Sequence, residues 1–78
     1  MLKVLVVDDE SVVRRGIVLG VDWASMGCVV VAEAGDGKEG FEKILECRPD
    51  VVITDICMPF MDGIEMIKKA SEQVRFKS

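Results

Sequence analysis

Three aspartates stand at the ends of apolar segments, and they are the residues of this sequence most suited to chemistry. Residues 51–54 are apolar or β-branched and lead directly into Asp55, and the apolar residues 4–7 lead into Asp8 and Asp9. A short, almost wholly apolar run is typical of a parallel strand that is buried on both faces. The carboxyl ends of parallel strands meet at one edge of an open α/β sheet, where such sheets bind ligands. We therefore expect Asp8, Asp9 and Asp55 to converge at one edge of a sheet.

A cluster of three carboxylates favours a hard divalent cation. Like charges in a partly buried place repel one another, and a cation relieves that repulsion. Mg²⁺ prefers oxygen ligands in octahedral geometry, keeps several waters, and takes one or two carboxylates together with phosphate oxygens. An aspartate beside bound Mg²⁺ can also attack a phosphoryl group to give an aspartyl-phosphate. The alternative is that the acidic residues 8–10 only cap the helix that follows them.

The remaining sequence predicts three strands and three helices in alternation. The β-branched runs predict strands at residues 3–7, 28–34 and 51–54. Each strand is followed by apolar residues at helical spacing: Val13, Ile17 and Val21, then Phe41, Ile44 and Leu45, then Ile67, Ala70 and Val74. This βαβαβα order predicts an α/β fold with a parallel sheet, right-handed crossovers and helices on both faces.

Local signals predict where the helices begin and end. Ser11, with the acidic residues before it, should lie at the first turn of the first helix, which should end near residues 22–23. Residues 36–39 and 62–65 both have the Asp-Gly-x-Glu spacing of a capping box and should open the second and third helices. The second helix should stop at Arg48, because the proline after it disfavours helical geometry at that position.

Composition limits the class of protein. The chain has 78 residues, enough for one small domain, and its net charge of −4 gives no electrostatic footprint for nucleic acid or an anionic membrane. Three cysteines without metal-ligand spacing indicate reduced thiols rather than a disulfide framework or a zinc site. No apolar run approaches the roughly 20 residues that a membrane-spanning helix needs. We therefore expect a cytoplasmic protein.

Four segments together resemble a known family. They are KVLVVDDE at residues 3–10, EAGDG at 33–37, VVITDICMP at 51–59 and MDG at 61–63. In order and spacing they are similar to the receiver domain of two-component response regulators, the CheY-like superfamily. The resemblance implies a flavodoxin-like doubly wound sheet of strand order 2-1-3-4-5, of which this chain would supply 2-1-3. VDW at residues 21–23, followed by Gly27, further resembles receivers joined to AraC-type DNA-binding domains.

The resemblance also implies a role for each site residue. Asp55 matches the phosphoacceptor, which receives a phosphoryl group from a histidine kinase. Asp9 matches the direct Mg²⁺ ligand, Asp8 matches the second acidic residue, which holds metal-bound water, and the backbone carbonyl of Cys57 matches a main-chain ligand. Gly63 matches a residue that shapes the loop after the active aspartate, a tight place where we expect any small residue to serve.

The chain departs from a complete receiver domain in its extent. Residues 1–78 match the N-terminal portion, whereas the fourth and fifth strand–helix units, with their Ser/Thr and lysine, have no counterpart here. None of the lysines follows an apolar strand and could replace the missing one. We therefore expect metal binding to persist, phosphotransfer to be inefficient and the switch to be incomplete. The third strand would become a sheet edge, which predicts that the chain either self-associates along it as a homodimer or recruits a complementary half.

Two other functions remain open at this point. An aspartate-nucleophile phosphatase would need an Asp-x-Asp arrangement, whereas Asp8 and Asp9 are adjacent, so we expect no enzyme activity. A non-catalytic interaction or assembly fragment would keep the fold without the switch. Arg14 and Arg15 would either contact a kinase or form a solvated face, and Trp23 would either pack the first helix against the next loop or bind a partner. Phe60 is the best candidate for an exposed aromatic contact.

Overall fold

Three parallel strands form one sheet in the order β2-β1-β3, with β1 at its centre. The computed structural model describes residues 1–55 and 61–71. The elements in chain order are β1 (Leu2–Val7), α1 (Ser11–Gly20), a 3-10 helix η1 (Ala24–Met26), β2 (Cys28–Ala34), α2 (Gly37–Cys47), β3 (Val51–Thr54) and α3 (Gly63–Ser71). The predicted fold class and the strand order 2-1-3 are thus confirmed, and the predicted strands agree with the observed ones to within one residue.

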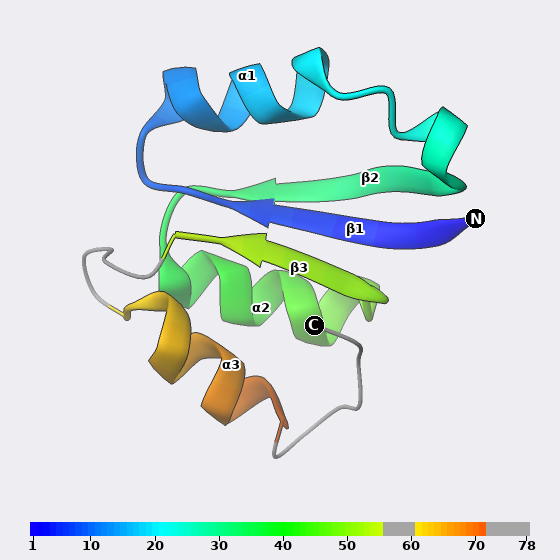
Figure 1. The fold of residues 1–78 in the computed structure, drawn as a ribbon. Coiled ribbons are helices and arrows are strands. Elements are labelled where there is room, and N and C mark those ends of the chain that lie inside the picture. The colour runs from blue at the N-terminus through cyan, green and yellow to red at the C-terminus, as the bar shows by residue number, and fades with distance from the viewer. Residues whose placement is uncertain (56–60, 72–78) are drawn as a thin grey trace.

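The register of the sheet brings the three strand ends level with one another. Val7, the last residue of β1, pairs with Ala34 of β2 on one side and with Thr54 of β3 on the other. The residues that follow these positions therefore emerge at the same edge of the sheet (Figure 1). This is the edge to which the sequence assigns Asp8, Asp9 and Asp55.

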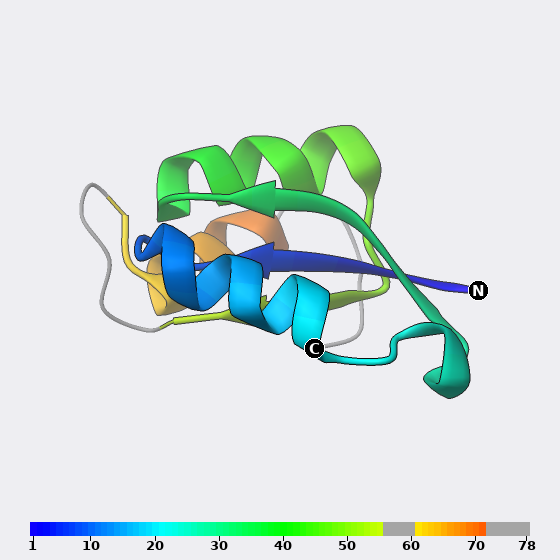
Figure 2. The ribbon, with the colours of Figure 1, turned by 90° about the horizontal axis from the view of Figure 1, so that it is seen from above.

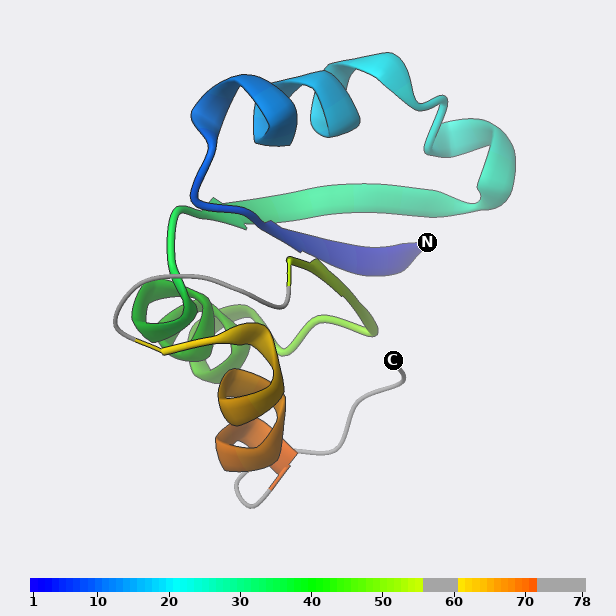
Figure 3. The ribbon, with the colours of Figure 1, turned by 60° about the vertical axis from the view of Figure 1, so that its left-hand side comes forward.

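Helices cover the two faces of the sheet unequally. α1 lies over one face, while α2 and α3 lie side by side over the other (Figures 1 and 3). The main core is on the α2 and α3 side, and its buried members are Leu5, Val7, Ala34, Ile44, Met66 and Ala70. Full burial of a Leu, Ile or Met side chain contributes about 1.5–3 kcal/mol, so this face supplies most of the apolar stabilisation of the fold.

The burial of the strands corrects one expectation. Val4 to Val7 in β1 are at most 1% exposed, so β1 is buried on both faces as predicted. All four residues of β3 are only half-buried, and the expectation that β3 is buried on both faces is therefore wrong. The physical reason is position, because β3 has a neighbour on one side alone within the described residues.

α1 also differs from its prediction. No residue of α1 is buried, and of the predicted apolar stripe Val13 is 44% exposed and Val21 is 37% exposed, with Ile17 half-buried. α1 is the sole α-helix on its face of the sheet within the described residues (Figure 2), and no other α-helix packs against its sides to bury them. The helix ends at Gly20, and Val21 is extended instead of continuing the helix to residues 22–23.

All three helices begin where the local signals predict, and two of them have a side-chain cap. Asp36 Oδ1 accepts a hydrogen bond from the Glu39 backbone N–H at 2.8 Å, and Asp62 Oδ1 accepts one from Glu65 at 2.8 Å. α1 begins at Ser11, which therefore lies in the first turn as predicted, and its N-cap Glu10 makes no side-chain cap hydrogen bond. α2 ends before Arg48, which adopts a left-handed conformation with φ 48°, in agreement with the effect of the following proline.

Trp23 joins α1 to β2, as the packing prediction proposed. Its indole Nε1–H donates to the carbonyl of Val18 in α1 at 3.2 Å, and its own carbonyl accepts from the Cys28 N–H at 2.9 Å. Gly27, at φ 71°, turns the chain into β2, and its carbonyl accepts from the Leu2 N–H. These bonds lie at the amino ends of β1 and β2, so Trp23 is at the edge of the sheet opposite to Asp8.

Candidate metal site at the carboxyl edge of the sheet

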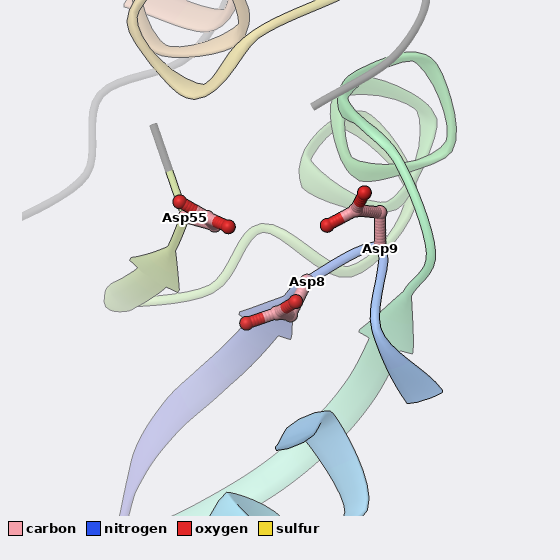
Figure 4. Close-up of side chains that lie close together, drawn as sticks. All are labelled: Asp8, Asp9 and Asp55. Atoms are coloured by element: carbon pink, nitrogen blue, oxygen red, sulfur yellow. The ribbon is translucent and has the colours of Figure 1, made fainter. Parts of the chain in front are cut away.

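The three aspartates converge as the sequence predicts. One carboxylate oxygen from each of Asp8, Asp9 and Asp55 lies within 4.8 Å of the other two. Asp8 and Asp9 come from the turn after β1 and Asp55 comes from the end of β3, and the three side chains border a common space (Figure 4). Asp8 is 9% exposed, whereas Asp9 and Asp55 are exposed. The site therefore combines one largely buried carboxylate with two that a solute can reach.

Asp8 is held by both its backbone and its side chain. Its N–H donates to the carbonyl of Ala34 at 3.0 Å, which continues the β1–β2 ladder by one residue. One of its carboxylate oxygens, Oδ1, accepts from the Glu10 N–H at 2.9 Å. Its carbonyl accepts from Arg14 Nη1 at 2.7 Å. These contacts fix both the position of Asp8 and the direction of its carboxylate.

Asp55 is placed by the sheet and by α3. Its N–H donates to the carbonyl of Val7 at 3.1 Å, and its carbonyl accepts from the Thr54 hydroxyl at 2.8 Å. A Cβ added at Gly63, the first residue of α3, would overlap the Asp55 carbonyl oxygen. Only glycine fits this position without a shift, so the expectation that any small residue would serve at 63 is wrong.

Gly37 makes a second close contact, between the start of α2 and the segment that leads into α3. A Cβ added at Gly37, the first residue of α2, would overlap the backbone of Met61. Asp-Gly therefore begins both helices, and each glycine allows a close backbone approach beside the acidic edge. The capping boxes predict the starts of the two helices. They do not predict the contacts of Gly37 with Met61 and of Gly63 with Asp55, because the partners in each contact are distant in sequence.

The donor set fits a hard cation. Three carboxylates offer oxygen ligands alone, and the exposure of Asp9 and Asp55 leaves room for water and a phosphate oxygen, which is the coordination that Mg²⁺ prefers. The predicted fourth ligand, the backbone carbonyl of Cys57, lies outside the described residues, as does Phe60. Cys28 and Cys47 are free thiols. Within the described residues, no helix is long and apolar enough to span a membrane.

Comparison with known proteins agrees with the fold. The family model of the response regulator receiver domain matches residues 4–75. The chain belongs to the response regulator receiver domain family. Receiver domains bind Mg²⁺ at an acidic site and interact with histidine kinases and output domains, and those of transcriptional regulators are mostly non-enzymatic. The family resemblance predicted from the four sequence segments is thereby confirmed.

Transcriptional regulators are among the individual relatives. The uncharacterized transcriptional regulatory protein YesN of Bacillus subtilis is 44% identical over 71 residues, which are 91% of this receiver chain and 19% of that protein. The receiver domain of AraT, a response regulator from Geobacillus stearothermophilus, is 46% identical with a TM-score of 0.87, over 92% of this chain and 56% of that one. A two-component transcriptional regulator AraC from Clostridium phytofermentans is 33% identical with a TM-score of 0.85, over 94% of this chain and 57% of that one. The chain thus spans little more than half of these solved structures, and AraC-type regulators are among its neighbours.

Proposed function

We propose that this receiver chain is the phosphoacceptor module of a two-component system, in which Asp55 accepts a phosphoryl group from a histidine kinase in a Mg²⁺-dependent step. The observation that carries the proposal is the approach of three carboxylates, from two different strand ends, to within 4.8 Å of one another. A helix-capping role for residues 8–10 does not account for this convergence, because Asp55 follows a different strand and α1 has no side-chain cap.

Each aspartate has a distinct role in the proposal. A carboxylate oxygen of Asp55 forms a bond to phosphorus in line with the bond to the donor's histidine nitrogen, which breaks and leaves the imidazole. Asp9, which is exposed and follows Asp8 directly, would be the direct ligand of the ion. Asp8 would hold the ion through a water, which suits a carboxylate that already accepts from the Glu10 N–H through one oxygen. Asp55 and the backbone carbonyl of Cys57 would be the remaining protein ligands. When bound, Mg²⁺ offsets negative charge on the transferring oxygens.

The output of the module is DNA binding through a further domain. This proposal rests on the similarity to YesN, a transcriptional regulatory protein, and to an AraC regulator. We also propose that residues 1–78 are the N-terminal portion of the receiver, since they cover 56% of the AraT receiver domain. The Ser/Thr and lysine of the family would then come from the fourth and fifth strand–helix units.

Acetyl phosphate tests the proposal directly. Incubated with acetyl phosphate and MgCl₂, the protein should gain the mass of one phosphoryl group, and chelation of Mg²⁺ should prevent the gain. Asp55→Asn should abolish it while leaving the circular dichroism spectrum unchanged. A mass gain that persists in Asp55→Asn would refute the assignment of the phosphoacceptor.

The exposed edge of β3 favours a second candidate, a non-catalytic assembly fragment. Each residue of β3 is half-exposed, β3 pairs with β1 alone among the residues that the structure describes, and an unpaired strand edge is a template for another chain. In this candidate two copies pair along β3 as a homodimer, without phosphotransfer. Light scattering over a concentration series should then show a dimer, and a monomer at high micromolar concentration with cooperative unfolding would exclude it.

A further inference from the structure

Arg14 links the acidic edge to the end of β2. Its Nη1 donates to the carbonyl of Asp8 at 2.7 Å, and its Nε donates to Glu33 Oε1 at 3.2 Å. The side chain of Arg14 is 19% exposed, so most of the guanidinium and its stem are enclosed. The side chain of Arg14 thus connects the turn that carries Asp8 and Asp9 to β2, the strand next to β1.

Neighbouring groups hold Arg14 in this position. Glu33, near the end of β2, pairs with Arg14 through one oxygen and with Arg15 through the other. A Cβ added at Gly35 would lie 3.4 Å from Arg14 Nη1, so the guanidinium passes directly beside the backbone after β2. An arginine fork bound at two points loses less freedom per hydrogen bond than a lysine would. The contact to Asp8 is therefore already formed when a ligand arrives.

The contact matters because, among the described residues, Arg14 is the charged side chain that donates to the backbone of Asp8. The carbonyl of Asp8 is bound to a positive charge, and hydrogen bonds to charged groups contribute about 1.5–3 kcal/mol, more than neutral ones. Without it the turn at residues 8–10 keeps its backbone bonds to Ala34 of β2 and to Arg14 of α1, but the Asp8 carbonyl loses its charged link to the Glu33 side chain. The carboxylates of Asp8 and Asp9 would then sample a wider range of positions.

We propose that Arg14 is a positioning residue of the acidic site, which holds Asp8 and Asp9 in the arrangement that binds the divalent cation. The inference rests on the proposed Mg²⁺ site. Partners that orient metal ligands usually change metal affinity by 10- to 100-fold when they are removed. The charge of Arg14 acts in the opposite direction, since a nearby cation disfavours a second one. A loss of affinity on neutralising Arg14 therefore reports positioning and not charge.

Arg15 supplies a matched control for this test. It is adjacent, has the same side chain and pairs with the same glutamate, but it is 53% exposed and its ion pair with Glu33 is a surface contact of little energetic weight. Isothermal titration calorimetry of the full chain with MgCl₂ should give a Kd roughly tenfold higher for Arg14→Gln than for the natural sequence. Arg15→Gln should stay within about twofold.

Two further measurements separate positioning from general stability. Without Mg²⁺, Arg14→Gln should speed hydrogen exchange at the Glu10 amide, which is bonded to Asp8 Oδ1, while the amides of β1 and α2 exchange as before. If Arg14→Gln does not fold, Arg14→Lys decides, because it keeps the charge without the fork and should still weaken Mg²⁺ binding severalfold.

Equal Mg²⁺ affinities for the natural chain and the folded Arg14 variant would overturn the positioning role and leave the metal site standing. An increase in Kd that is the same in Arg14→Gln and Arg15→Gln would overturn it too. A natural chain that binds no Mg²⁺ would instead refute the proposed site itself, so the two failures are distinguishable.

Discussion

Gly63 lies directly against the carbonyl oxygen of Asp55, so that the first residue of α3 touches the backbone of the aspartate at the end of β3. The hydroxyl of Thr54 donates to the same carbonyl at 2.8 Å, and a Cβ at residue 63 would also come within 3.1 Å of that hydroxyl oxygen. α3 is therefore in direct contact with the residue that we propose as phosphoacceptor. The position of Asp55 depends on how closely this helix can approach.

Gly63→Ala should test that dependence. The added methyl group overlaps backbone rather than a flexible side chain, so either α3 or Asp55 must move. We expect a loss of about 1–3 kcal/mol in the free energy of unfolding, measured by urea denaturation, together with weaker Mg²⁺ binding. Unchanged stability and unchanged Mg²⁺ affinity would show that the contact is not tight in solution.

Gly16→Ala is the matched control for this substitution. Gly16 lies within α1, and nothing is within 4 Å of a Cβ added there. Alanine is favoured over glycine in a helix by up to about 1 kcal/mol, so this variant should be more stable than the natural chain. Changes of opposite sign in the free energy of unfolding for the two glycine variants would separate the effect of space from that of helix propensity.

The sequence predicts the elements and the acidic cluster because both depend on local pattern and strand direction. Apolar runs such as Val4 to Val7 define the strands, and parallel strands must bring Asp8 and Asp55 to one edge. The contacts of Arg14 with Glu33 and of Gly37 with Met61 could not be predicted, since they join residues from different strand–helix units. The exposure of α1 was also missed, because helical spacing at Val13 and Ile17 gives a candidate apolar face but not the element that would cover it.

The cap of α2 should contribute measurably to stability. Asp36 Oδ1 accepts from the Glu39 N–H at 2.8 Å, and the Glu39 side chain in turn accepts from the Gly35 N–H at 2.7 Å. Asp36→Ala removes the acceptor and should lower the free energy of unfolding by about 1 kcal/mol. Asp36→Asn keeps an acceptor of the same shape, so its free energy of unfolding should be close to that of the natural chain. A loss of the same size in both variants would point to the charge, not the hydrogen bond.

Mg²⁺ should stabilise the folded protein and reverse the effect of carboxylate repulsion. Binding to the folded state alone adds about 2.7 kcal/mol at a concentration one hundred times Kd, so the melting temperature should rise with MgCl₂ and fall back on chelation. Asp9→Asn should melt at or above the natural chain without Mg²⁺, because one of three close negative charges is gone, and should gain almost nothing when Mg²⁺ is added. If Asp9→Asn gained as much as the natural chain, Asp9 would not be a ligand.

Trp23 fluorescence should report unfolding but not Mg²⁺ binding. Trp23 is bonded to Cys28 at the amino end of β2, whereas Asp8 follows the carboxyl end of β1, which is six residues long. At about 3.3 Å per residue these ends are roughly 17 Å apart, so an ion among the aspartates does not contact the indole. Emission should stay constant in a Mg²⁺ titration whose binding heat is clear by calorimetry.

Trp23→Phe removes the indole bond to the Val18 carbonyl and should lower the free energy of unfolding by about 1 kcal/mol without altering the Mg²⁺ affinity. A parallel loss of affinity would mean that the two edges of the sheet are coupled.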